Sequence, residues 1–138
     1  MVHQLKRDRA RLTVELNGGL ENLDDCLTQL ERVDGAMVGR AAYAHPLRWV
    51  GVDRLVFDDG NQPLATASSV VRGLIPHAEQ WRSRGERLWP IARHLVHVVE
   101  GVSGARRWRQ QLSEEAGQRD AEPMVLDAAA RALEERGY

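Results

Sequence analysis

Two short glycine-containing segments have residue types that could bind an anionic ligand. Asn17, Gly18 and Gly19 follow one short apolar run, and Gly39 and Arg40 end a second. Glycine permits positive φ and lets a ligand approach the backbone, and amides at the start of a following helix can hold a phosphate. Arg40 would add a bidentate positive charge. An ordinary tight turn uses the sequence Asn-Gly-Gly equally well, so the first segment alone leaves both interpretations open.

The elements around these glycines predict a strand, a helix and a second strand. Residues 11–16 read as a short strand, and residues 36–40 read as a buried parallel strand. The segment 20–33 between them places apolar residues three and four apart, as an amphipathic helix does. In a β/α barrel the loops after neighbouring strands lie side by side at one face, so one phosphate could contact both glycine segments. A further helix is expected after Pro46.

The second half of the chain is predicted to be helical. Residues 58–69 are rich in glycine, proline, asparagine and small side chains, which places a domain boundary there, with domains 1–60 and 61–138. Apolar residues at helical spacing predict helices over 70–82, 88–99, 105–115 and 124–136. Four helices on short connections are typical of a small bundle. The expected fold class is therefore α/β in the first half and all-α in the second.

The charge of the chain is uneven, although its net charge is only −1 over 138 residues. Residues 72–110 contain eight arginines and three glutamates, which suits a nucleic-acid partner. Arg106 and Arg109 are three residues apart on a predicted helix and can meet one line of phosphates, whereas Arg107 points elsewhere. Trp108 between them is expected in the core rather than stacked on a base. No membrane span or secretory signal is visible, so we expect a cytoplasmic protein.

Residues 3–57, which include "NGG" and "VGRAAY", resemble the end of the barrel in tRNA-dihydrouridine synthases of the A type. The segment "IARHLVHVVEGVSGARRWRQQLSEEA" resembles the C-terminal helical domain of that family, whose pattern is approximately R-H-x-L-G-L-F-x-G-x-P-G-A-R-x-W-R-R-x-L-S-E. The resemblance covers Val2 to about Leu133. It implies the last βα units of a TIM barrel, followed by a helical tRNA-binding domain.

The family resemblance also implies an activity and a set of binding residues. Members of this family are FMN-dependent enzymes that use NADPH to reduce uridine to 5,6-dihydrouridine in the tRNA D-loop. By the same resemblance tRNA would contact Arg106, Arg109 and Arg93, the last from the Arg-His pair of the family pattern. The residues that would hold the FMN phosphate are Asn17, Gly18, Gly19, Gly39 and Arg40.

Several departures from the family pattern limit this interpretation. The family's active-site cysteine loop and its earlier flavin contacts have no counterpart here, so we assign no catalytic residue and expect the isolated chain to be inactive. Cys26 is expected on the packed face of a helix, and the scattered histidines predict no metal site. Ser103 stands where the family has proline, and Gln110 replaces its second arginine.

Two alternatives stay open at this point. The chain could be a stand-alone RNA-binding helical module without catalysis, or an unrelated phosphate-binding β/α protein. If it is part of a barrel, a missing N-terminal barrel half or a second copy of the chain is the expected partner at the open barrel edge.

Overall fold

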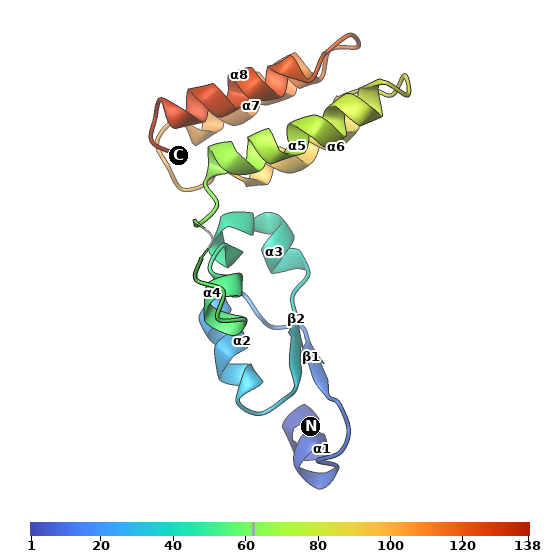
Figure 1. Cartoon of the computed structure of the whole chain (residues 1–138), viewed down its shortest axis with the longest axis vertical. Coiled ribbons are helices and arrows are strands. Elements are labelled where there is room, and N and C mark those ends of the chain that lie inside the picture. The colour runs from blue at the N-terminus through green and yellow to red at the C-terminus, as the bar shows by residue number, and fades with distance from the viewer. Residues whose placement is uncertain (62) are drawn as a thin grey trace. The chain divides into compact units, whose positions relative to one another are not determined.

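The computed structural model describes residues 1–61 and 63–138, which form two compact units (Figure 1). The first, Met1–Leu64, is called the sheet unit below, and the second, Ala65–Tyr138, the helical unit. They meet in the sequence near the expected division between residues 60 and 61. Each unit has its own buried residues.

The sheet unit contains the expected strand, helix and strand. Strands β1 (Glu15–Asn17) and β2 (Gly35–Met37) pair in parallel, with Leu16 opposite Ala36. Helix α2 (Leu23–Leu30) connects them, which confirms the predicted β-α-β order. The strands are shorter than the predicted ranges 11–16 and 36–40, because the ladder is limited to three residue pairs.

Helix α1 (Val2–Asp8) precedes β1 and was not predicted. None of its residues is buried, so the helix packs no fully apolar face against the rest of the sheet unit. Polar contacts attach it to the sheet unit instead. Lys6 Nζ lies 2.7 Å from Asp34 Oδ2, which also accepts a 2.8 Å hydrogen bond from the Val14 amide. These two donors hold the pKa of Asp34 below its ordinary range.

The segment after β2 folds differently from the prediction. Arg40 was expected to end the second strand, but β2 stops at Met37 and Arg40 is the first residue of helix α3 (Arg40–Ala44). Arginine followed by three alanines and a tyrosine favours helix over strand, which explains the error. The single helix expected after Pro46 is a 3-10 helix, η1 (Pro46–Trp49), followed by α4 (Val52–Val56).

The core of the sheet unit forms between α2 and the elements that pack on it. Leu20, Leu23 and Cys26 are buried at its centre. The residues around them come from both strands, from η1 and from α4, so the core fixes the position of the strand ends. The partly buried members are Leu16, Leu27, Ala36, Val38, Trp49, Val52 and Val56.

The helical unit consists of α5 (Ala67–Arg82), α6 (Trp89–Ala92), the 3-10 helix η2 (Arg93–His97), α7 (Ala105–Ala116) and α8 (Met124–Glu134). The helix expected over 88–99 is thus divided between α6 and η2, and a four-helix bundle stays a prediction. Helix α5 begins with a capping box, in which Thr66 and Ser69 each accept a backbone hydrogen bond. Helix α8 packs against both α5 and α7.

Trp108 lies in the core of the helical unit, as the sequence predicted. It is 2% exposed, and its Nε1 donates a 3.2 Å hydrogen bond to the Ala129 carbonyl of α8. The bond satisfies the one polar atom of the indole, so the ring can be buried without penalty. Other large side chains that are fully buried here are Leu88, Leu112, Leu126, Leu133 and Val71. Among the described residues, no helix is long and apolar enough to cross a membrane.

Candidate functional site

The two glycine segments lie at the same edge of the sheet. Asn17 pairs with Met37 at the end of both strands, and parallel strands run in the same direction, so both chains leave the sheet at one level. Gly18 and Gly19 then adopt φ values of +103° and +73°, which residues other than glycine rarely adopt. These conformations turn the chain from β1 toward α2.

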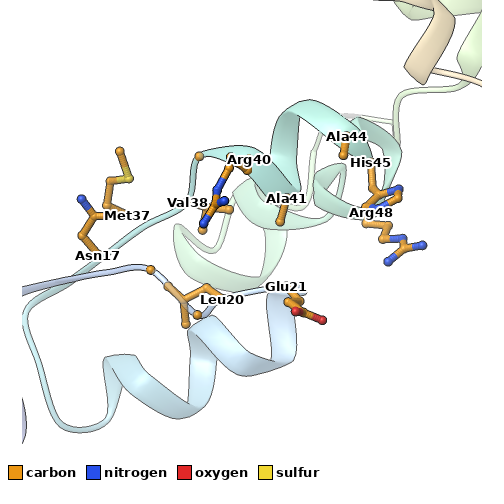
Figure 2. Close-up of a pocket in the computed structure, with 13 residues that line it drawn as sticks. Asn17, Leu20, Glu21, Met37, Val38, Arg40, Ala41, Ala44, His45 and Arg48 are labelled. Atoms are coloured by element: carbon orange, nitrogen blue, oxygen red, sulfur yellow. The ribbon is translucent and has the colours of Figure 1, made fainter.

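A cavity of about 710 Å³ lies at this edge (Figure 2). Figure 2 shows the side chain of Arg40 extending from the start of α3 toward the loop that carries Leu20 and Glu21. The structure therefore brings together all five residues predicted to hold a phosphate. The residues that line the cavity are Asn17, Gly18, Gly19, Leu20, Glu21, Met37, Val38, Gly39, Arg40, Ala41, Ala44, His45 and Arg48.

The backbone is open to a ligand at three glycines of this cavity. A Cβ atom built on Gly18, Gly19 or Gly39 would have no atom within 4 Å beyond the glycine itself and its two chain neighbours. Room therefore remains beside the main chain, where a bound group could approach the amides. The lining carries two arginines, Arg40 and Arg48, against one carboxylate, Glu21, and this charge balance favours an anion.

The start of α2 contributes less to anion binding than the sequence suggested. Asn22 Oδ1 accepts a 2.8 Å hydrogen bond from the Asp25 amide, and Asp25 Oδ2 accepts a 3.3 Å bond from the Glu21 amide. Two amides at this helix start are thus capped by the chain itself. The glycine loop and Arg40 remain as the groups best placed to contact an anion.

Three charged or ionisable side chains of the cavity, Glu21, His45 and Arg48, were not among the predicted residues. Glu21 lies two residues after the glycine pair. His45 follows α3 directly, and Arg48 lies in η1. The alanines at 41, 42 and 44 are the signal that could have found them. A helix that begins at Arg40 carries the next turn of the chain along the cavity wall.

Cys26 is not part of this cavity. Its side chain is 5% exposed and packs beside Leu23 in the core. Burial raises the pKa of the thiol, and the nearby carboxylate of Asp25 raises it further, so the reactive thiolate is disfavoured. Within residues 1–61 and 63–138, no group of three or more histidine, cysteine, aspartate or glutamate side chains could hold a metal ion.

The arginines expected to contact RNA have different surroundings in the helical unit. Arg93, the first residue of η2, and Arg106 on α7 are exposed. Arg109 is half-buried, and its Nη1 donates a 2.8 Å hydrogen bond to the Val99 carbonyl. The side chain of Arg109 therefore connects α7 to Val99, which follows η2. Arg106 is the more accessible of these two arginines.

Comparison with known proteins places these features in one family. The family model for dihydrouridine synthase (Dus) matches residues 1–134. A tRNA-dihydrouridine(20/20a) synthase of Haemophilus ducreyi is 41% identical over 134 residues, which are 97% of this chain and 41% of that protein. The protein of the same description from Escherichia coli K12 is 38% identical over 135 residues, 98% of this chain and 39% of its own length.

A third relative from Yersinia pestis, described in the same words, is 40% identical over 128 residues, 93% of this chain and 37% of that protein. The chain thus spans about two fifths of the length of the curated relatives that it matches. Because the family model covers nearly every residue, from the N-terminal helix to the end of α8, the chain belongs to the dihydrouridine synthase family.

Proposed function

We propose that this chain is the C-terminal part of an FMN-dependent tRNA-dihydrouridine synthase. In this proposal residues 1–60 are the last βα units of a TIM barrel that binds the flavin, and residues 61–138 are a helical tRNA-binding domain. One observation carries it: the residues that the family resemblance assigns to the FMN phosphate come from two separate loops and line one cavity. The names of the relatives support tRNA as the substrate.

The residues of the cavity fit a phosphate monoester. The open backbone at Gly18, Gly19 and Gly39 leaves room for phosphate oxygens beside the amides, and the guanidinium of Arg40 can bind two of them. Asn17 is the last residue of β1 and fixes the start of the glycine loop. The chemistry that FMN supplies when bound is hydride transfer from NADPH to the uridine of the tRNA.

A comparison of two flavins tests the phosphate site. FMN and riboflavin share the ring system, and only FMN carries the phosphate. We expect the chain to bind FMN about tenfold or more tightly than riboflavin, measured by quenching of flavin fluorescence. The variant Arg40→Ala should lose this preference. Arg54→Ala removes an exposed arginine of α4 outside the cavity and should keep it. Equal affinities for the two flavins would contradict the proposal.

We expect the isolated chain to form no dihydrouridine. The family's active-site cysteine donates a proton to the uracil ring, and Cys26, the one cysteine of this sequence, is buried away from the cavity with a raised thiol pKa. The assay supplies FMN, NADPH and unmodified tRNA and measures dihydrouridine by mass spectrometry. Turnover by the purified chain would refute this part of the proposal.

A stand-alone RNA-binding role is the second candidate, and the separate core of the helical unit favours it. Trp108, Leu88 and Leu112 are buried and all belong to that unit. Arg93, Arg106 and Arg109 would then contact tRNA without any catalysis. Binding of the full chain to tRNA that persists when FMN does not bind would favour this candidate over the first.

A further inference from the structure

Arg107 lies on a different flank of α7 from Arg106 and Arg109. The buried face of this helix is marked by Trp108 and Leu112. Successive residues of an α-helix are turned by about 100°, which places Arg106 and Arg109 on one side of the buried face and Arg107 on the other.

Arg136 reaches this second flank from the C-terminal end of α8. A Cβ atom built on Gly104, the residue before α7, would lie 3.1 Å from Nη1 of Arg136 and 3.6 Å from its Cζ. The guanidinium thus packs against the backbone of Gly104, which has a φ of +83°. Residues three apart on a helix are neighbours, so Arg107 lies one turn along the same flank from Gly104.

The end of α8 holds Arg136 in a defined place. The Gly137 amide donates to the Glu134 carbonyl at 2.9 Å, and the Tyr138 amide donates to the Leu133 carbonyl at 3.0 Å. With Gly137 at a φ of +81°, this is a Schellman motif, a common hydrogen-bonded helix end. Arg136 is the residue immediately before that glycine and is anchored by both bonds.

Among the described residues, no carboxylate forms an ion pair with Arg107 or Arg136. Both are exposed, and within the described part of the chain neither forms an ion pair or a side-chain hydrogen bond. The adjacent Glu134 is bound through both of its carboxylate oxygens by Arg72, and Glu115 accepts from Gln111. Two like charges near one helix end repel each other, and an anion that contacts both removes this cost.

We propose that Arg107 and Arg136 form a phosphate-binding site for the backbone of RNA, on the flank of α7 opposite Arg106 and Arg109. The inference rests on the proposed RNA-binding function of the helical unit and adds a second contact to it. Arg136 lies beyond residues 1–134, the segment matched by the family model. The start of α7 would then bind phosphates on both of its flanks, which positions RNA without reading its sequence.

The test compares two double variants of the full chain that change its net charge equally. Arg107→Ala with Arg136→Ala removes the proposed site. Arg84→Ala with Arg119→Ala removes two exposed arginines from the turns after α5 and α7, which lie at the opposite end of the helical unit (Figure 1). Since α7 has 12 residues, the two ends are about 18 Å apart. Affinity for bulk tRNA is measured by fluorescence anisotropy at several salt concentrations, and circular dichroism checks the fold of each variant.

We expect the Arg107 and Arg136 double variant to bind tRNA at least tenfold more weakly than wild type, with a salt slope shallower by about one to two units. The control variant should lose less than threefold. Equal losses in the two double variants would overturn this inference alone, since the helical unit would still bind RNA. An absence of binding by the wild-type chain would overturn both this site and the proposed RNA-binding function.

Discussion

Arg72 of α5 and Glu134 of α8 form a bidentate ion pair. Nε and Nη2 of Arg72 donate to the two carboxylate oxygens of Glu134, each at 2.9 Å. Nη1 of the same guanidinium binds Asp127, whose other oxygen lies 2.7 Å from Arg131. Asp127 and Glu134 are seven residues apart, two turns along one face of α8. One side chain of α5 therefore connects to α8 at two points.

Replacing Arg72 should destabilise the helical unit in a graded way. Arg72→Ala loses the three hydrogen bonds from the guanidinium to Asp127 and Glu134 and keeps only the Asp127–Arg131 pair within α8. Arg72→Lys keeps the charge but cannot bind both oxygens of Glu134 in parallel, so its melting temperature should lie between those of wild type and Arg72→Ala. Thermal unfolding followed by circular dichroism measures this order. Arg84→Ala is the control, and a loss as large as that of Arg72→Ala would contradict the account.

The same pair makes stability depend on acid. The hydrogen bonds from Arg72 lower the pKa of Glu134 below its ordinary value of 4.5. A group with a lowered pKa in the folded state contributes stability above its unfolded pKa and loses it as the pH falls through the folded value. The difference in unfolding free energy between wild type and Glu134→Gln should therefore shrink as the pH falls from about 5 to 3. Glu135→Gln, at the exposed neighbour, should follow the wild-type profile, and identical profiles for all three proteins would refute the role of Glu134.

Two glycines of the helical unit should respond oppositely to alanine. Gly73 is exposed inside α5, and apart from its chain neighbours and the backbone of the helix itself no atom lies within 4 Å of a built Cβ, so Gly73→Ala should stabilise the protein by about 0.5–1 kcal/mol. Gly104 has a φ of +83°, and Gly104→Ala should cost about 1–2 kcal/mol through backbone strain. Urea unfolding of both variants measures the difference. Equal effects would show that the conformation of Gly104 is not fixed.

Two glycines of the cavity separate ligand binding from folding. Gly39 has a φ of −115°, outside the left-handed region, so Gly39→Ala should cost less stability than Gly19→Ala and yet place a methyl group where the phosphate would lie. Gly19 has a φ of +73°, so the variant Gly19→Ala should lose FMN affinity and also about 1–2 kcal/mol of stability. Fluorescence titration and urea unfolding are run on the same samples. Unchanged FMN affinity in Gly39→Ala would place the phosphate elsewhere.

Much of the secondary structure could be predicted from apolar spacing. Helix α2 was expected because Leu20, Leu23, Leu27, Leu30 and Val33 recur at spacings of three and four. The two strands were expected from the short apolar runs that end beside the glycines. Helix α1 was missed because it has no buried residue and is held by Lys6 and Asp34, a contact between residues distant in sequence. Such polar contacts leave no periodic signal.

The cavity was only partly predictable for a related reason. Asn17, Gly18 and Gly19 could be identified because glycine after a strand has a direct conformational meaning. Arg40 lines the same cavity, but it begins α3 and was wrongly assigned to a strand end. The positions of Glu21 and Arg48 depend on how α3 and η1 fold back along the cavity, which spacing along the chain does not encode.

Amide chemical shifts of the chain during titration with FMN test the central claim most directly, because they locate the phosphate residue by residue. Proton–nitrogen correlation spectra are recorded with FMN and then with riboflavin at the same concentrations. The account predicts that the amides of Gly18, Gly19 and Gly39 shift with FMN and not with riboflavin, and that Arg40→Ala abolishes the difference. Shifts of the same size with both flavins, or FMN shifts confined to residues outside the cavity, would contradict it.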